Sequence, residues 1–454
     1  MSFSIKNSEH LLIGAILFYS GLVFCLPVLP ASSWAETMTY PWWASRIQFN
    51  LIILNEALFI VWLLLFGGKF VLRNIFNKLG IPTRQAAICL IFLGVWCGVV
   101  SVILDFSTIT QNIGRTVRLI LLAFMLIAAV KWARSLGNFV LVALVSGILV
   151  GTIINLIISF QNPFILWGSF RLHGQNTPGV WMGLAAHLSA WLFALSENIK
   201  TKVFSAITLF VCGFACLLSF SRIGWIILGL GLVSWFVLLV VKTKANNRKN
   251  VPLTILILCI PLGNLISSPQ FSEITSGVIK LVNQKTWIGS DSNSERSSYI
   301  YGTTEIVLKN PFGVGYSGFY DAMIETQVYK SGAAARETRP KEANPHMTFL
   351  WYASTGGILA SLLSIFLFYL LARTIKNNLF RLFGRPGMVL STCFIGSMLM
   401  IGVTVPYLFN SLIFYLPVAI ISGLAMSRLE RDHELDFLFA NGISYKSNFS
   451  SQTN

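Results

Sequence analysis

Charged residues are scarce in this sequence, and acidic residues are the scarcest. Asp, Glu, Lys and Arg make up 11% of the 454 residues and hydrophobic residues make up 55%, whereas a soluble domain carries about 25% charged residues. The chain has 17 Asp and Glu against 33 Lys and Arg, for a formal net charge of +16. This composition excludes an ordinary soluble domain and predicts a chain whose solvent is largely the lipid bilayer.

The basic excess does not indicate a nucleic-acid partner, because of where the basic residues lie. They gather in short links between long apolar stretches, at 69–84, 242–249 and 373–385. Cytoplasmic loops of membrane proteins carry such clusters under the positive-inside rule. The net charge therefore reports membrane topology, and we expect no binding of nucleic acid.

The sequence also lacks the motifs of metal, redox and nucleotide sites. Its seven cysteines all fall in apolar stretches, in an odd number and without a paired CxxC spacing, which argues against a disulfide framework and a zinc site. The run "PFGVGYSGF" lacks the GK[ST] ending of a phosphate-binding loop. We find no internal repeat and no outer acidic cluster that suggests a divalent metal. We therefore expect packing cysteines, no metal and no cofactor.

Long apolar stretches are abundant, and about 20 such residues suffice for a helix to cross the bilayer. Twelve stretches lie near 11–30, 49–67, 86–104, 117–131, 138–160, 177–196, 203–220, 223–241, 251–267, 347–372, 388–406 and 408–427. An N-terminus in the cytoplasm puts every basic cluster on one side, with both termini cytoplasmic. The sequence thus predicts an all-α polytopic integral membrane protein, with a transmembrane domain over 1–427 and a cytoplasmic tail over 428–454.

One predicted outer link is long, over residues 268–345. Structureless loops rarely exceed about 15 residues, so we expect helices within it that cap the outer face. "SNSERSSYIYGTTEIVLKNP" predicts a helix that is capped by Asn293 or Ser294 and stopped at Asn310 and Pro311. "QFSEITSGVIKLV" predicts an amphipathic helix, and "PFGVGYSGF" predicts a tight glycine turn.

Ionisable residues are few on the predicted outer side, and four of them are candidates for chemistry. His346 lies where the long loop meets the tenth span, and neutral imidazole suits a general base. Arg171, Arg222 and Arg296 lie on the same side, although the positive-inside rule disfavours arginine in short outer links. A guanidinium fork suits bidentate phosphate binding, and Arg296 would add a helix N-terminus. Each residue alone is explained by contact with lipid headgroups, but the four together predict an anionic-substrate site.

Other polar residues lie inside predicted spans. Glu56 is in the second span, where a carboxylate is costly; it is either functional or a structural counter-ion for an arginine such as Arg118. Arg115 and Arg118, at the outer end of the fourth span, are either substrate contacts or snorkelling side chains. His187 is predicted to be a buried, hydrogen-bonded packing residue.

Four short motifs follow one another between residues 170 and 372: "RLHGQNTP", "SFSRIG", the arginine helix with its "PFGVGYSGF" turn, and "NPHMTFLWYASTGGILA". Their order resembles that of the O-antigen ligase and polymerase family of bacterial membrane proteins. Two positions depart from the family. Met347 follows the histidine where asparagine is common, with Asn344 two residues before the histidine, and "ASTGG" lacks the acidic residue often found before the glycines.

The resemblance implies a GT-C-like, metal-independent, inverting glycosyltransferase of the O-antigen ligase or polysaccharide polymerase type. It would move glycan from a polyprenyl-diphosphate donor, such as undecaprenyl diphosphate, to an acceptor glycan, either a lipid core or a growing polysaccharide. The reaction would take place on the outer face of the bacterial cytoplasmic (inner) membrane, in lipopolysaccharide or exopolysaccharide biosynthesis. Arg171, Arg222 and Arg296 would bind the donor diphosphate, and His346 would activate the acceptor hydroxyl.

Two alternatives stay open at this point. A protein-glycosylating ligase would use the same donor chemistry with another acceptor. A transporter of a small anion such as bicarbonate belongs to a different class, in which inverted repeats and interrupted helices surround a midplane site. The candidate residues here lie at one face beneath a long loop, and no repeat is found, which favours the transferase.

Overall fold

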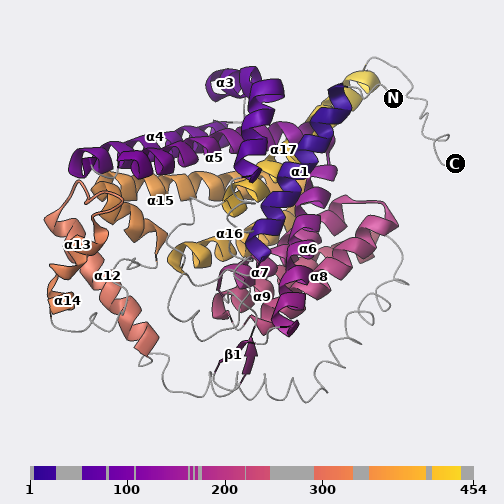
Figure 1. The fold of residues 1–454 in the computed structure, drawn as a ribbon. Coiled ribbons are helices and arrows are strands. Elements are labelled where there is room, and N and C mark those ends of the chain that lie inside the picture. Colours follow the sequence, from indigo (N-terminus) through magenta and orange to yellow (C-terminus); the bar gives the residue numbers. More distant parts are fainter. Residues whose placement is uncertain are drawn as a thin grey trace.

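The computed structural model is an array of α-helices with one short β-hairpin (Figure 1). It describes residues 5–26, 54–77, 81–106, 109–161, 164–166, 169–171, 176–219, 221–245, 291–330, 347–404 and 412–440. The elements are α1 (Ile5–Cys25), the π-helical turn η2 (Leu63–Gly67), α3 (Gly68–Asn77), α4 (Ile81–Leu104), α5 (Ile109–Leu136), α6 (Phe139–Gln161), β1 (Phe164–Leu166), β2 (Ser169–Arg171), α7 (Asn176–Leu195), α8 (Ile199–Leu218), α9 (Arg222–Ala245), α12 (Asp291–Lys309), α13 (Phe319–Ile324), α14 (Gln327–Lys330), α15 (Thr348–Phe383), α16 (Arg385–Thr404) and α17 (Leu412–Ala440).

The apolar stretches form helices, because in lipid a helix satisfies its own backbone hydrogen bonds. Within the described residues, nine helical segments are long and apolar enough to cross a membrane. Every predicted span overlaps a described helix except that at 251–267, which lies outside the described residues. The chain is therefore a helical multi-pass membrane protein, as predicted, and the total of twelve spans stays a prediction.

Small residues allow the helices to approach closely. Gly147 and Gly151 lie one turn apart on α6, and a Cβ at either position would meet a backbone carbonyl of α1, at Phe18 or Leu22. Membrane helices commonly pack through such GxxxG contacts, because apolar side chains gain little by leaving lipid. Glycines at the contacts of α7 with α9 and of α5 with α17 act in the same way.

A buried histidine joins three of the helices. His187 lies on α7 with no exposed surface. Its Nε2 is 2.9 Å from the Ser397 hydroxyl of α16, and its Nδ1 is 3.2 Å from the Ser234 hydroxyl of α9. The prediction of a buried, hydrogen-bonded packing histidine is confirmed.

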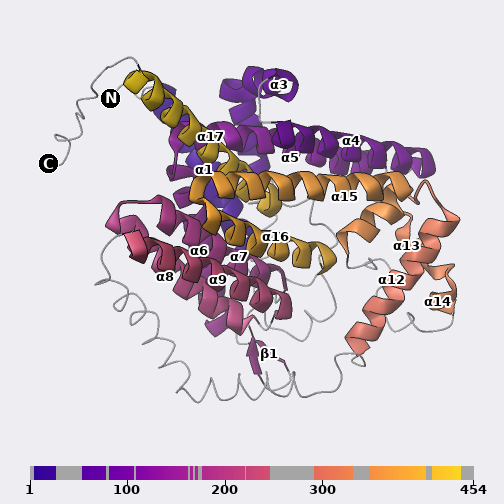
Figure 2. The same cartoon turned by 180° about the vertical axis from the view of Figure 1, so that it is seen from behind.

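The two ends of the described chain lie together. The first turn of α1 and the last turn of α17 are at one end of the array, whereas α12, α13 and α14 lie at the other (Figures 1 and 2). This placement agrees with an even number of membrane crossings. Location of the termini in the cytoplasm, and of residues 268–345 outside it, stays a prediction.

Reporter fusions test this sidedness. Alkaline phosphatase requires disulfides and so matures only in the oxidising outer compartment. We expect a sandwich fusion just before α12, within residues 268–290, to be active, and fusions in the 69–84 link or after residue 440 to be inactive. An inactive reporter beside α12, in a stably inserted protein, would reverse the topology and remove the basis for an outer site.

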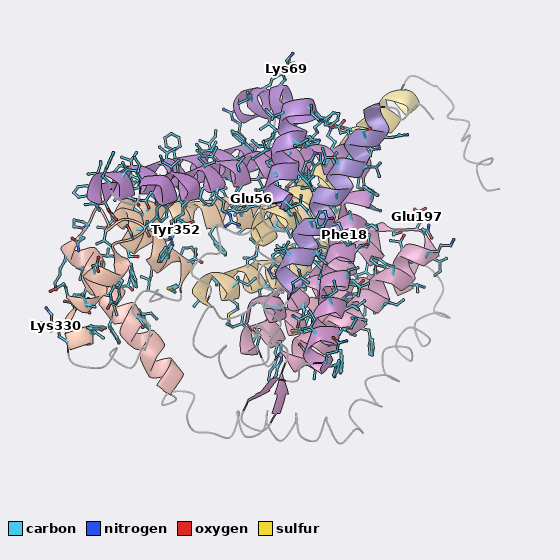
Figure 3. The ribbon with its side chains drawn as sticks, viewed as in Figure 1. Phe18, Glu56, Lys69, Glu197, Lys330 and Tyr352 are labelled. Atoms are coloured by element: carbon cyan, nitrogen blue, oxygen red, sulfur yellow. The ribbon has the colours of Figure 1, made fainter. Side chains whose placement is uncertain are left out.

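Helix α15 departs from the predicted uninterrupted span over 347–372. Gly356 (φ −122°, ψ 16°) and Gly357 (φ 72°, ψ −162°) are not helical, so α15 consists of a short helix before the glycines and a long helix after them. Figure 3 places Tyr352 on the short piece. The hydropathy of the stretch is continuous, but two adjacent glycines have the conformational freedom to break the helix.

Candidate functional site

The links that carry Arg171 and Arg222 meet at one end of the helix array. Arg171 ends β2, opposite Phe164 in the hairpin, and the chain then enters α7. The first turns of α7 pack against the turn between α8 and α9, where a Cβ on Gly179 would meet Ser219 and Ser221. The fold therefore brings the two predicted diphosphate-binding segments to the same end, as their places in the sequence predict.

Serine side chains build the turn that holds the backbone of Arg222. Ser219 Oγ donates to the Cys216 carbonyl (2.6 Å) and accepts from the Ser221 N–H (3.2 Å). Ser221 Oγ accepts from the Gly224 N–H (3.1 Å), which makes Ser221 the N-cap of α9. Arg222 is thus the first residue of α9, at the positive end of the helix dipole, where an anion is favoured. The serines of "SFSRIG" thus cap the start of α9, and Arg222 is the residue that follows this cap.

Arg296 lies on α12, in the predicted outer loop. The predicted helix is confirmed, but it begins at Asp291, so Asn293 and Ser294 are inside the helix rather than caps. An acidic residue is itself favourable in a first helical turn, and cap preferences are too weak to fix the start. Arg296 is therefore in the second turn, where the dipole contributes less than we expected.

A carboxylate on α12 organises the neighbouring short helices. Glu305 Oε1 accepts from Lys309 Nζ at 2.6 Å, and Glu305 Oε2 accepts from the backbone N–H of Gln327, the first residue of α14, at 2.9 Å. The hydrogen bond from Lys309 lowers the pKa of Glu305 below its ordinary value. On α14, Lys330 pairs with Glu325 at 3.0 Å (Figure 3). The described part of the loop thus contains helices, as predicted, and its role as a cap over the site stays a prediction.

The glycine turn after α12 is bound to the break in α15. The N–H groups of Val314 and Gly315 donate to the carbonyls of Ser354 and Thr355, at 2.7 and 3.0 Å, and the Ile358 N–H donates to the Pro311 carbonyl at 2.9 Å. These bonds satisfy backbone groups that the break releases. We call residues 311–317 together with 354–358 the joint.

Glycine is required at the centre of the joint. Gly313 (φ 92°) and Gly357 (φ 72°) both have positive φ, a region that is costly for other residues. A Cβ on Gly357 would also meet the backbone of Pro311 and Phe312. The glycines of "PFGVGYSGF" and of "ASTGG" are therefore two halves of one contact, although 41 other residues separate Gly315 from Gly357 in the chain.

The ends of α4 and α5 hold the joint from the other side. The Tyr316 N–H donates to Ser101 Oγ at 2.8 Å. Arg115 Nη1 donates to the Tyr316 carbonyl at 3.2 Å, and its guanidinium lies 5.2 Å from the centre of the Tyr316 ring. Ser317 Oγ donates to Asp105 Oδ2 at 2.9 Å. In this structure Arg115 holds the loop, a role that was not among the two that we expected for it.

The predicted base precedes the joint by one short helix. His346 and Asn344 lie outside the described residues, and Met347 is the N-cap of α15 (φ −142°, ψ 125°) without a side-chain hydrogen bond. An asparagine at this position, as is common in the family that the sequence resembles, would supply the missing cap. The methionine at position 347 therefore leaves the N-terminus of α15 without a side-chain cap.

Replacement of Gly357 tests the joint. Gly357→Ala should reduce stability by roughly 1–2 kcal/mol from positive φ and a further ~1–3 kcal/mol from overpacking. Gly384→Ala is the matched control, because Gly384 also has positive φ (65°) but an added Cβ there would meet nothing within 4 Å. We expect thermal unfolding of the purified protein at a lower temperature for Gly357→Ala than for Gly384→Ala; equal midpoints would mean that the joint is loose.

Glu56 pairs with Arg118 across the second span and α5. Glu56 Oε1 is 2.9 Å from Arg118 Nε, and the two side chains are 34% and 41% exposed. Arg118 Nε makes no aligned hydrogen bond, so the contact is a charge pair. Figure 3 places Glu56 in the middle of the array, away from α12–α14. Of the two roles expected for Glu56, the geometry matches the counter-ion.

The joint is the part of the site that sequence reasoning missed. Ser101 and Arg115 come from separate segments and carry no motif, and Tyr316 lies in "PFGVGYSGF" without any signal that names its partners. Paired glycines in an otherwise apolar span were the available signal. Among the described residues, no group of three His, Cys, Asp or Glu is placed to hold a metal ion.

These observations define a multi-pass helical membrane protein in which the loop segment 311–317 is docked on an interrupted helix. Residues 207–365 match the family model described as O-antigen ligase, and this confirms the predicted resemblance. The matched stretch includes Arg222, Arg296, His346 and both halves of the joint, while Arg171 precedes it. No curated protein matches the chain. The chain is thus O-antigen ligase-like over this stretch, and together with the membrane helices the match supports a membrane protein that processes glycans.

Proposed function

We propose that the protein transfers glycan from a polyprenyl-diphosphate-linked donor to an acceptor sugar, at the outer face of the bacterial cytoplasmic membrane. The observation that carries the proposal is the O-antigen ligase match, because it covers Arg222, Arg296 and His346 within a multi-pass helical array. The acceptor is the lipid core in a ligase, or the end of a growing chain in a polymerase. Both reactions use the same donor chemistry.

In the proposed reaction the acceptor hydroxyl oxygen attacks the anomeric carbon of the donor sugar, and the bond from that carbon to the diphosphate oxygen breaks. The diphosphate leaves on its lipid with the bonding electrons. Arg171, Arg222 and Arg296 offset its growing negative charge, and His346 takes the proton of the hydroxyl. Attack from the face opposite the diphosphate inverts the anomeric configuration. Since arginine supplies the positive charge, we infer that no metal is needed.

The turn before α9 supports this assignment. The backbone of Arg222 is fixed at a helix N-terminus by Ser219 and Ser221, so both the helix dipole and an arginine are available to one phosphate group. Gly179 and Gly224 allow α7 to pack closely against this turn. The segment that follows Arg171 is therefore held beside the segment that carries Arg222.

Anion transport is the alternative, and the interrupted helix α15 is the feature that favours it. Transporters use unwound backbone groups at such breaks to bind their substrate ions. In α15 the carbonyls of Ser354 and Thr355 and the N–H of Ile358 are bonded to the glycine turn of the loop. The break thus serves to dock the loop, which favours the transferase.

A paired assay separates the two functions. The purified protein in lipid nanodiscs is given a lipid-linked oligosaccharide donor and an acceptor glycan, with EDTA present, and the masses of the products are measured. The same protein in liposomes is tested for bicarbonate uptake. We expect joined glycan and no uptake. Uptake without transfer would replace the proposed function by the alternative, and transfer that stops in EDTA would overturn the metal-independent mechanism.

A further inference from the structure

The short helix α3 has one polar and one apolar side. Lys69 and Arg73 lie one turn apart and are exposed, and Figure 3 shows Lys69 pointing away from the protein. Val71 is buried, whereas Leu72 is 56% exposed on the edge next to the basic residues. An amphipathic helix with basic residues at the edge of an exposed apolar strip is suited to the surface of a bilayer.

The π-helical turn η2 leads the chain into α3. The helix that begins at Leu54 crosses towards this end of the array, and η2 itself exposes Leu64 (80%) and Leu65 (68%). Gly67 leaves room for the Trp62 ring, which a Cβ at that position would overlap. In Figures 1 and 2, α3 lies out of line with the preceding helix and projects from the array. Such changes of direction are common at π-turns.

A charge-and-aromatic cluster fixes α3 to the rest of the protein. The Lys131 ammonium of α5 lies 5.1 Å from the Phe70 ring centre of α3 and 5.3 Å from the Trp62 ring centre. Glu9 of α1 lies 3.5 Å from Lys131 Nζ and accepts from Trp62 Nε1 at 3.3 Å. Lys131 is therefore paired within the protein and is not free to bind lipid. Its contact with Phe70 fixes the position of α3, which carries Lys69 and Arg73.

The cations of α3 have no acidic residue nearby in the sequence. No Asp or Glu occurs between Glu56 and Asp105. The same interval contains four basic residues, Lys69, Arg73, Lys78 and Arg84. In the part of the chain that the structure describes, neither Lys69 nor Arg73 forms an ion pair. Juxtamembrane basic residues of this kind are attracted to anionic lipid.

We propose that α3 is a binding site for anionic phospholipid headgroups, in the leaflet that the predicted topology makes cytoplasmic. Lys69 and Arg73 bind the headgroup phosphates, and Leu64, Leu65 and Leu72 contact the acyl chains beneath them. The inference is independent of the proposed transferase reaction, because α3 lies at the end of the second span that is remote from α12–α14 (Figure 1).

The test uses the full-length protein in nanodiscs of phosphatidylcholine, alone or mixed with phosphatidylglycerol. Native mass spectrometry counts retained phosphatidylglycerol, and tryptophan fluorescence gives the thermal midpoint. We expect phosphatidylglycerol to raise the midpoint of the wild type. Lys69→Gln with Arg73→Gln should weaken phosphatidylglycerol binding roughly 30-fold, at about one factor of five for each cation.

The matched control is Lys309→Gln with Lys330→Gln. It removes the same charge from two lysines that already pair with Glu305 and Glu325. We expect this control to retain lipid as the wild type does. Equal loss of phosphatidylglycerol in both double variants would mean that lipid retention depends only on the net charge of the protein. Unchanged retention in the α3 variant would refute the site.

Discussion

Replacement of His346 by alanine is expected to slow glycan transfer by about 10²–10⁴-fold, the usual contribution of a positioned general base. Donor binding should survive, because the diphosphate is assigned to the arginines. The measurement is a single-turnover rate with purified protein, lipid-linked donor and acceptor, together with donor affinity. An equal fall in rate and in donor affinity would indicate a structural role instead.

The control for His346 is a second histidine change at a remote place. His10→Ala alters α1, at the end of the array that holds the termini (Figure 1), and should keep the wild-type rate. If His346→Ala also transfers at the wild-type rate, the base lies elsewhere. Glu56 would then be tested next, through Glu56→Gln, although its pairing with Arg118 at 2.9 Å favours a structural role.

Replacement of Arg222 by lysine is expected to slow transfer by about 10²-fold although the charge is kept. A lysine ammonium cannot reproduce the bidentate fork, and loss of one preorganised donor to a developing anion costs about 10²–10³-fold. Arg171→Lys should have an effect in the same direction. The rate with saturating donor is the measurement, because headgroup anchoring would leave it unchanged.

Arg385→Lys is the matched control for the arginine changes. Arg385 is exposed at the start of α16, in a basic cluster of the predicted cytoplasmic side, and its replacement should leave transfer intact. Normal rates in both Arg171→Lys and Arg222→Lys would show that these residues only anchor the protein to headgroups. A slower transfer rate in Arg385→Lys as well would mean that the protein is sensitive to arginine replacement in general, and the effect at Arg222 would not indicate a phosphate contact.

The helices were predictable because their cause is local. Twenty apolar residues in lipid form a helix whatever surrounds them, so α6 and α7 differ from the predicted spans by one residue at each end. The predicted uninterrupted span over 347–372 was wrong, because its break depends on distant residues. The break at Gly356 and Gly357 has no local signal in hydropathy, because a loop segment from another part of the sequence completes it.

For the candidate site, too, the positions that follow from topology were predictable and the contacts that follow from packing were not. Arg171 and Arg222 follow alternate crossings, so topology alone predicts that their links share one end of the array. The pairing of Glu56 with Arg118 was one of two open interpretations, since the sequence does not specify which helices become neighbours. The contact of Arg115 with Tyr316 depends on three-dimensional packing of α5 against the loop, and no pattern in either segment predicts it.

The lipid product of a single turnover tests the central claim most directly. The proposed reaction breaks the bond between the anomeric carbon and the diphosphate oxygen, so mass spectrometry should find one polyprenyl diphosphate for each glycan joined, with EDTA present. Polyprenyl monophosphate would contradict the account, because it would mean that a phosphorus–oxygen bond broke and that a glycan phosphate was transferred. Intact donor after incubation with acceptor would contradict it altogether.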